Sequence, residues 1–315
     1  MRIGYGLSCE EYGPADLIRQ ARLAEKAGFT ALWISDHYHP WNNAQGQSPF
    51  VWSVIGAVSQ VTDLPITTAV TCPTLRIHPA VIAQAAATSA VMNRGRFTLG
   101  VGSGEALNEH IFGDAWPTAP RRLEMLEEAV DVMRALWSGD VVNHDGEYYT
   151  VEHARLYTVP DEPVPVYVSG FGPRATDLAA RVGDGYISVK PDKDSVDRFR
   201  AGEGKDKPAW AGAKACYAAT EHQARGIAHR LWANEGLPGE LAQVLPTPEH
   251  FEQASELVTP DMVKMACGPD PEVHRAMVDT YRDAGYDTLF VAPVGPHDEQ
   301  MIDLYCKEII PSLAG

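Results

Sequence analysis

Short apolar runs alternate with longer amphipathic stretches along most of the chain. β-Branched and aromatic residues dominate the short runs, whereas apolar residues recur every three or four positions in the longer stretches. The short runs predict eight strands, at residues 2–7, 31–35, 66–70, 97–101, 166–169, 186–189, 211–218 and 288–292. The longer stretches predict helices at residues 14–27, 79–92, 121–137, 173–182, 221–234, 271–284 and 299–312. This alternation is typical of βαβ units and a parallel sheet.

The number of strands indicates the fold class. Eight strands with intervening helices predict an α/β fold of the closed (β/α)8 TIM-barrel type, because a doubly wound sheet more often stops at five or six strands. A chain of 315 residues with 45% hydrophobic residues suits one large core, so a single domain over residues 1–315 is favoured over two small ones. Insertions are expected around residues 141–160, starting with a hairpin, and at residues 236–271, which could cover the active-site face.

Charge and cysteine usage narrow the partners and the compartment. The chain has 26 basic and 42 acidic residues, and a formal charge of −16 repels nucleic acid and anionic membrane surfaces. Its five cysteines are scattered without a CxxC or zinc spacing, which indicates free thiols in a reducing cytoplasm. The N-terminus lacks the apolar stretch of a signal peptide, and no segment is apolar enough to span a bilayer. We therefore expect a cytoplasmic protein whose partner is a small molecule.

Polar residues follow the second predicted strand, where barrels of this type carry catalytic groups. The segment at residues 35–41 reads SDHYHPW. His37 is a candidate general base, because imidazole titrates near neutral pH and can accept the proton of an alcohol, and Trp41 would wall the pocket. A helix cap with packed aromatic residues fits this position equally well. No third ligand accompanies His37 and His39, so no metal site is expected.

A glycine-rich segment follows the fourth predicted strand. Its GxGxG spacing places Glu105 where a dinucleotide-binding fingerprint requires a third glycine, so that fingerprint fails. The small residues would instead let a flat ring approach the backbone and leave Glu105 as a carboxyl group in the pocket. The alternative is a tight loop with a capping acid.

A third segment, at residues 169–174, joins the fifth predicted strand to a helix. Pro173 suits the first helical position, and the preceding glycines expose amide hydrogens at the positive end of the helix. This pattern predicts a phosphate site, where Arg174 either adds a charge-assisted contact or is simply solvated.

Several segments together resemble the F420-dependent glucose-6-phosphate dehydrogenase group of the luciferase-like barrel superfamily. The segments are SDHYHPW at 35–41, TCPTLR at 71–76, PAVIAQ at 79–84, GVGSGEALNE at 100–109 and LWSGD at 136–140. Their combination is far more specific than any one of them, and the likeness reaches about residue 189 and returns in the last strand and helix. The resemblance implies a usually dimeric (β/α)8 barrel that moves a hydride between a hydroxyl carbon and C5 of the deazaflavin coenzyme F420.

The resemblance also implies roles for single residues. His37 would take the hydroxyl proton, Glu105 would protonate the reduced ring at N1, and Trp41 would stack over the reaction centre. The implied coenzyme contacts are Asp36, Asn108, Ser169, Gly170, Phe171, Gly172, Arg174 and Ala175, the last six around its phosphate. The family keeps a non-proline cis peptide behind the ring, which would fall at Ala69-Val70. Cys72 stands where relatives often carry threonine, so a hydroxyl contact to the ring would be weakened.

The candidate substrate site departs from the family pattern. Relatives hold a sugar phosphate with two lysines and an arginine, and here Lys190 or Lys193 would supply the first lysine and Lys264 the second. Lys190 and Lys193 are more typical of solvated loop lysines. The last loop, at residues 296–301, reads PHDEQM and lacks the arginine, which argues against glucose 6-phosphate.

These observations predict an F420-dependent dehydrogenase of a secondary alcohol or sugar hemiacetal that lacks a tightly held phosphate. The alternatives are a glucose-6-phosphate dehydrogenase, an FMN-dependent monooxygenase of the same superfamily, and a coenzyme-binding barrel without catalysis. The paired His37 and Glu105 disfavour the last alternative, because a protein that only binds needs no acid–base pair.

Overall fold

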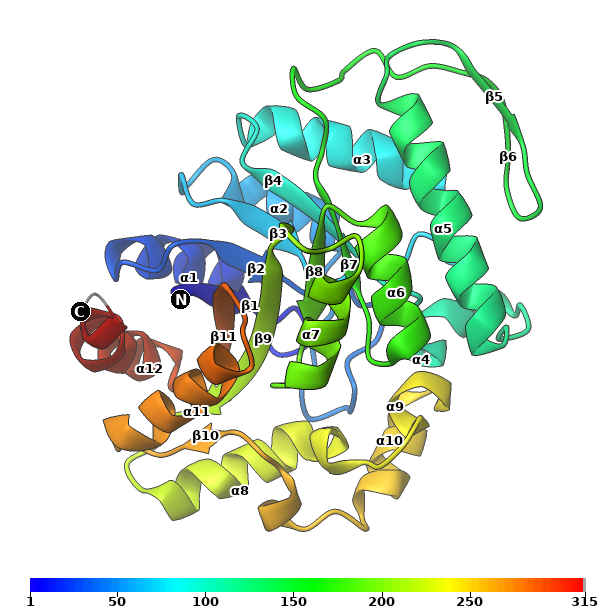
Figure 1. Ribbon diagram of the computed structural model, residues 1–315. Coiled ribbons are helices and arrows are strands. Elements are labelled where there is room, and N and C mark those ends of the chain that lie inside the picture. The colour runs from blue at the N-terminus through cyan, green and yellow to red at the C-terminus, as the bar shows by residue number, and fades with distance from the viewer. Residues whose placement is uncertain (314–315) are drawn as a thin grey trace.

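Eight parallel strands close on themselves in the computed structural model, which describes residues 1–313 (Figure 1). Around the ring they are β1 Arg2–Leu7, β2 Leu32–Ile34, β3 Ile66–Thr68, β4 Phe97–Val101, β7 Val166–Ser169, β8 Gly185–Ser188, β9 Ala209–Cys216 and β11 Thr288–Pro293. The barrel closes because the last strand, β11, pairs with both β9 and β1. In the β1–β11 pair, Thr288 lies opposite Arg2. The (β/α)8 barrel expected from the sequence is confirmed.

Strand ends differ from the predicted ones in an informative way. The second and third strands stop at Ile34 and Thr68, short of the predicted residues 35 and 70. After β3 the chain passes through a cis peptide at Ala69-Val70 and then pairs with β4 again at Thr71, opposite Val101. A further two-residue strand, β10 Ala266–Cys267, pairs with the end of β9 outside the closed ring.

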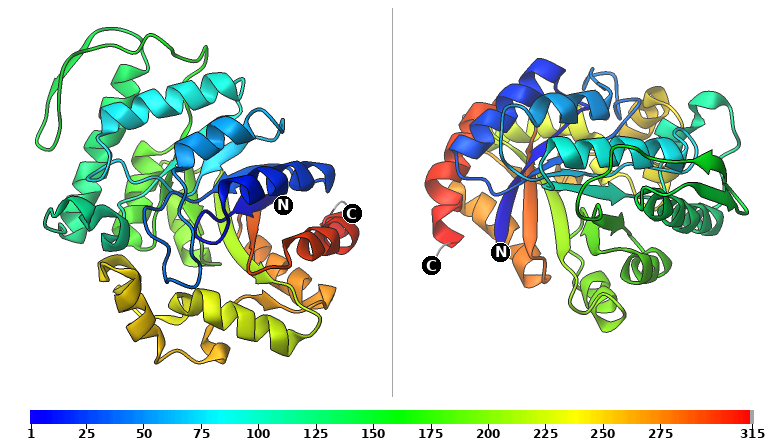
Figure 2. Two further views of the ribbon diagram at one scale, coloured as in Figure 1. Left: turned by 180° about the vertical axis from the view of Figure 1, so that it is seen from behind. Right: turned by 90° about the horizontal axis from the view of Figure 1, so that it is seen from above.

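Helices surround the barrel on its outer side (Figure 2). They are α1 Pro14–Lys26, α2 Val51–Val58, α3 Pro79–Met92, α5 Ala119–Leu136, α6 Pro173–Val182, α7 Lys193–Ala201, α8 Glu221–Trp232, α11 Pro271–Asp283 and α12 Asp298–Leu304. The sequence pattern missed α2, which has no polar face, and α7, which is short and mostly polar. The last predicted helix divides into α12, a π turn and a 3-10 turn. Across residues 1–313, no helix combines the length and apolarity needed to cross a membrane.

Aromatic rings fill the inside of the barrel. Trp33, Tyr167 and Phe290 are buried together there, and the rings of Trp33 and Phe290 stack with centroids 5.2 Å apart. A Cβ atom at Gly4 would collide with the ring of Phe290, and one at Gly212 with the ring of Trp33. These glycines therefore make room for the packed rings, which leaves the chemistry to the barrel mouth.

Two segments extend the barrel where the sequence predicted insertions. Strands β5 Val142–Asp145 and β6 Thr150–Ala154 form a hairpin that projects from the body of the molecule (Figure 1). The second segment contains α9 Leu241–Val244 and α10 Pro248–Ser255. Helix α9 contacts the short helix α4 Ala106–Glu109, so this segment packs against the loop that follows β4.

Candidate active site

The side chain of Asn108 joins the two candidate acid–base residues. Its Oδ1 accepts hydrogen bonds from the backbone N–H groups of Tyr38, at 2.8 Å, and His39, at 3.2 Å, which fixes the amide orientation. Its Nδ2 then lies 3.1 Å from Nδ1 of His37 and donates to Oε2 of Glu105 at 3.3 Å. The loops after β2 and β4 therefore bring His37 and Glu105 into one site.

Glu10, which the sequence reasoning missed, lies on the other side of His37. Its Oε1 is 3.4 Å from Nε2 of His37, and its Oε2 accepts hydrogen bonds from the hydroxyls of Ser35 at 2.6 Å and Ser8 at 2.8 Å. Burial raises the pKa of Glu10, but the charge of His37 and the Ser35 hydrogen bond outweigh it and bring the pKa below its ordinary value. Glu10 follows β1 directly, so the strand-end rule applied to His37 could have found it.

The imidazole of His37 has partners in its neutral and its cationic form. The Asn108 amide nitrogen, a donor, and the His39 carbonyl oxygen, an acceptor, both lie 3.1 Å from Nδ1. The ring of Trp41 lies beside it, with centroids 5.1 Å apart, and is supported edge-on by Phe251 of α10 at 5.1 Å. The long insertion thus helps to wall the site.

Arg76 clamps the loops that carry these residues. Its guanidinium donates to Oδ1 of Asp36 at 2.9 Å, and its backbone N–H donates to Oε2 of Glu109 at 2.7 Å. Thr71 donates to the other oxygen of Asp36 at 2.8 Å, and the side chain of Asp36 is only 1% exposed. Both carboxylate oxygens of Asp36 are therefore engaged, so a coenzyme contact at this residue would use its backbone.

The glycines after β4 make room for the end of β3. A Cβ atom at Gly102 would lie 2.7 Å from Cγ2 of Val70, and one at Gly104 would lie 2.6 Å from Sγ of Cys72. Gly104 also has a φ of +80°, a conformation that favours glycine. The peptide bond between Ala69 and Val70 is cis, as the family resemblance implied. Packing within the protein is therefore enough to explain why these positions are glycine, and no contact with a coenzyme ring is needed to explain them.

Cys72 remains a neutral thiol in this packing. It is buried, and its Sγ lies 3.0 Å from Oγ1 of Thr74. Burial, and next the charge of Glu109, raise the pKa of the thiol well above its ordinary value. The hydroxyl expected from relatives is replaced here by a group with weaker hydrogen bonding.

The candidate phosphate site lies at the first turn of α6. Gly172 precedes Pro173 at the helix start, and the first amides of a helix have no intrahelical partner. Phe171 and Arg174 are exposed there, and the ammonium of Lys190 lies 5.9 Å from the centroid of the Phe171 ring. Lys190 is therefore near the candidate coenzyme phosphate site.

The three candidate substrate lysines have different surroundings. Lys193 is exposed and pairs with Asp197, one helical turn away, at 2.7 Å, as expected of a solvated lysine. Only Lys264 of the three lines a cavity of about 380 Å³ at the ends of β8 and β9. Lys214 and Glu235, which the sequence reasoning missed, line the same cavity. Among residues 1–313, no three His, Cys, Asp or Glu side chains gather to hold a metal ion.

A closed parallel barrel with acid–base side chains at the carboxyl ends of its strands defines a (β/α)8-barrel enzyme. The chain belongs to the luciferase-like monooxygenase family, whose model matches residues 1–288. The family resemblance inferred from the sequence motifs is thereby confirmed.

Curated relatives are similar over their whole length. The F420-dependent glucose-6-phosphate dehydrogenase of Microbacterium testaceum (strain StLB037) is 35% identical over 328 aligned residues, which cover 99% of this chain and 97% of the relative. The protein of the same name from Amycolatopsis mediterranei (strain U-32) is 34% identical, and the alignment covers 99% of this chain and 98% of the relative. A solved F420-dependent secondary alcohol dehydrogenase, in complex with an F420-acetone adduct, is 33% identical, with a TM-score of 0.91 over 98% of both chains.

Proposed function

We propose that this chain is an F420-dependent dehydrogenase that removes a hydride from the hydroxyl-bearing carbon of an alcohol or sugar. The relatives that it matches over nearly their full length are named as F420-dependent enzymes. One similar solved structure is a complex with an F420-acetone adduct. The observation that carries the proposal is the contact of Asn108 with both His37, at 3.1 Å, and Glu105, at 3.3 Å. A proton acceptor and a proton donor thus share one site at the barrel mouth.

The residues present fit this coenzyme. The segment from Gly170 to Ala175, with Ser169, would hold its phosphate, because the first amides of α6 that follow Pro173 have no intrahelical partner, and the exposed ring of Phe171 lies beside them. When bound, the deazaflavin supplies the carbon that accepts the hydride and the ring nitrogen that accepts a proton. Glu105, held by the amide of Asn108 at 3.3 Å, would be the side chain that gives that proton.

His37 would handle the proton of the substrate hydroxyl. In the tautomer with its proton on Nδ1, donated to the His39 carbonyl, Nε2 is the nitrogen that accepts the substrate proton. The Glu10 carboxylate, 3.4 Å from Nε2, stabilises the resulting imidazolium. Trp41 and Phe251 exclude water from this exchange.

The substrate is a secondary alcohol or a sugar hemiacetal without a tightly held phosphate. Lys193 is held by Asp197, Lys190 lies over Phe171, and residues 296–301 contain no arginine. A phosphate group would therefore lack the paired donors that bind it strongly. Glucose 6-phosphate, the substrate in the names of several relatives, is the less favoured substrate for this chain.

Absorption spectroscopy tests the proposal. Purified enzyme with oxidised F420 is mixed with a panel of secondary alcohols and sugars, and the deazaflavin band is expected to bleach with some of them. Absence of bleaching across a broad panel would contradict the dehydrogenase reaction. Oxygen uptake with supplied reduced FMN would point instead to a monooxygenase.

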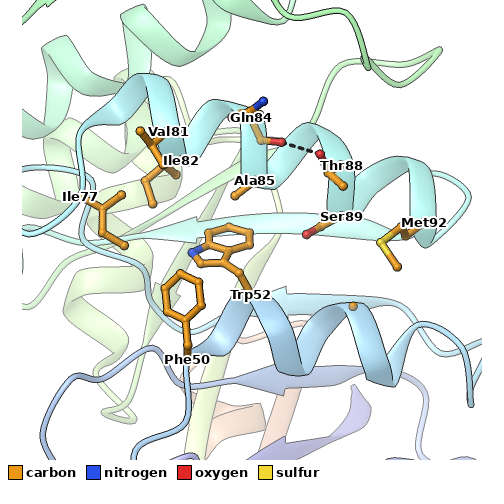
Figure 3. A pocket seen from close by; sticks show the side chains of 11 residues that line it. Phe50, Trp52, Ile77, Val81, Ile82, Gln84, Ala85, Thr88, Ser89 and Met92 are labelled. Atoms are coloured by element: carbon orange, nitrogen blue, oxygen red, sulfur yellow. Dashed lines mark hydrogen bonds between the residues drawn. The ribbon is translucent and has the colours of Figure 1, made fainter.

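We also propose that the chain forms a homodimer through the face of α2 and α3. A hollow of about 310 Å³ lies between these helices and is lined mostly by apolar side chains (Figure 3). Phe50 is 56% exposed beside it and Val81 is 55% exposed. Apolar residues occur all around α3, although one side already packs on the barrel, and a helix of this kind is normally covered. A second copy covers the same patch on both partners in a two-fold dimer.

Light scattering on two matched variants tests this dimer. Val81→Asp places a charge in the proposed interface and should convert the protein to monomers. Val141→Asp places the same charge on the projecting hairpin, where valine is 58% exposed, and should leave the dimer intact. Monomeric wild-type protein, or dimers in both variants, would contradict the proposed interface.

We place the protein in the cytoplasm. Its five cysteines are free thiols, and four of them are buried. Free thiols persist in reducing compartments, where the small-molecule substrate would also be encountered. Cell fractionation with antibody detection checks this location.

A further inference from the structure

The cavity at the ends of β8 and β9 contains cations that already have anionic partners. Lys214, Arg225 and Lys264 line it, together with the carboxylate of Glu235. Nζ of Lys214 lies 2.6 Å from Oε1 of Glu235, and Arg225 pairs with Glu221, one helical turn earlier, at 2.8 Å. Lys264 is exposed at the rim. Most of the positive charge of the cavity is thus neutralised by the chain itself.

Packed aromatic rings link Lys214 to the acid–base residues. Its ammonium is 4.0 Å from the ring centroid of Trp232, which is only 2% exposed. Trp232 belongs to the hydrophobic cluster against which Trp41 packs, and Trp41 lies beside His37. A substrate group that entered this cavity would meet the Lys214–Glu235 pair, which lines it.

The Lys214–Glu235 ion pair should disfavour the binding of anionic substrate groups but not of uncharged ones. A phosphate or carboxylate that approaches Lys214 meets the like charge of Glu235 and must displace it to gain a full ion pair. A hydroxyl or carbonyl oxygen needs only one of the remaining N–H donors of the ammonium, so it binds without breaking the pair. The Lys214 and Glu235 side chains are 22% and 36% exposed, so neither is buried too deeply for a ligand to reach.

We propose, building on the dehydrogenase function above, that Glu235 is a specificity-determining residue. By neutralising Lys214, it excludes anionic alcohols from the cavity. The substrates are therefore uncharged secondary alcohols and unphosphorylated sugars.

Phosphate binding to Glu235→Gln tests this assignment in the full-length protein. Thermal unfolding is followed during titration with inorganic phosphate, because a ligand that binds only the native state raises the Tm. The wild type should bind phosphate weakly, and Glu235→Gln at least tenfold more tightly. Adding Lys214→Met to that variant should return the affinity to the wild-type value. Glu256→Gln, an exposed change in the insertion that follows Glu235 and outside the cavity lining, should behave as the wild type.

Turnover provides the second measurement. The ratio of kcat/KM for glucose 6-phosphate to that for 2-propanol should rise at least tenfold in Glu235→Gln. Equal phosphate affinities in the wild type and Glu235→Gln, or a gain that survives Lys214→Met, would overturn the proposal. Failure of the dehydrogenase function would look different, because no alcohol would then bleach F420 in any variant, whereas the phosphate titration would still report on Glu235.

Discussion

At the scale of single residues, His37 works within a set of fixed partners. Glu10 faces Nε2, and Asn108 faces Nδ1 while it also contacts Glu105. The sequence motifs predicted His37, Asn108 and Glu105. They did not predict Glu10, which lies in the connection between the first strand and the first helix. Its role depends on a contact between residues 10 and 37, which become neighbours only because β1 and β2 pair in the barrel.

Replacing Glu10 by Gln should slow the reaction more than it weakens coenzyme binding. The change removes a charge-assisted contact to the imidazolium worth about 2 kcal/mol, which corresponds to roughly a 30-fold loss in kcat/KM. Steady-state kinetics and F420 titration measure the two effects separately. Ser8→Ala, which removes only one hydrogen bond to the same carboxylate, should have a smaller effect. An unchanged kcat/KM in Glu10→Gln would remove Glu10 from the proton transfer.

At the scale of secondary-structure elements, the site depends on how three loops are held together. Arg76, in the loop before α3, contacts Asp36 after β2 and Glu109 in α4. The sequence predicted most strands and helices, because each leaves a local periodic pattern. It could not predict this clamp, since the partners of Arg76 come from loops that are distant in the chain and meet only in the folded barrel.

Removing the clamp should lower stability strongly. Arg76→Met leaves Asp36 without its buried cation, and breaking such a pair typically lowers the free energy of unfolding by about 3 kcal/mol. Arg94→Met is the matched control, because its pair with Asp63 is 3.9 Å long and its side chain is 79% exposed. Urea denaturation should show a change below about 0.5 kcal/mol for the control. Equal stabilities of the two variants would contradict the clamp.

At the scale of the whole molecule, the strand count correctly predicted the closed barrel, whereas the substrate residues stay a prediction. Lys190, Lys193 and Lys264 were matched to family positions, yet only Lys264 lines the cavity. Lys214 and Glu235 line it together because β9 and the turn after α8 meet there, and this proximity leaves no motif in the sequence. Local pattern therefore indicates the scaffold and its strand ends, while side-chain pairing across loops decides what binds.

Buried carboxyl groups should make the stability of the whole molecule depend on pH. Burial raises the pKa of Glu11 from an ordinary 4.5 to about 7, although Trp232 and the backbone N–H of Gly295 donate to it. The native state thus binds its proton more tightly than the unfolded state. The contribution of Glu11 is fully present below pH 4.5 and is lost as the pH rises through 7.

Glu11→Gln should therefore flatten the stability profile. Between pH 5 and 8, the decrease in the free energy of unfolding should be smaller than in the wild type by about 2 kcal/mol. Urea denaturation at the two pH values measures it, with Glu256→Gln as an exposed control. Some decrease should remain in both variants, because burial also raises the pKa of Glu109 to about 7. A decrease in Glu11→Gln equal to that of the wild type would show that Glu11 is already ionised.

The most direct test of the account is a single-turnover measurement on His37→Asn. Enzyme saturated with oxidised F420 is mixed rapidly with a substrate alcohol, and the loss of the deazaflavin band is followed. Bleaching should be at least about 100-fold slower than in the wild type, with coenzyme affinity nearly unchanged, because only the proton acceptor is lost. Bleaching at the wild-type rate would contradict the role of His37.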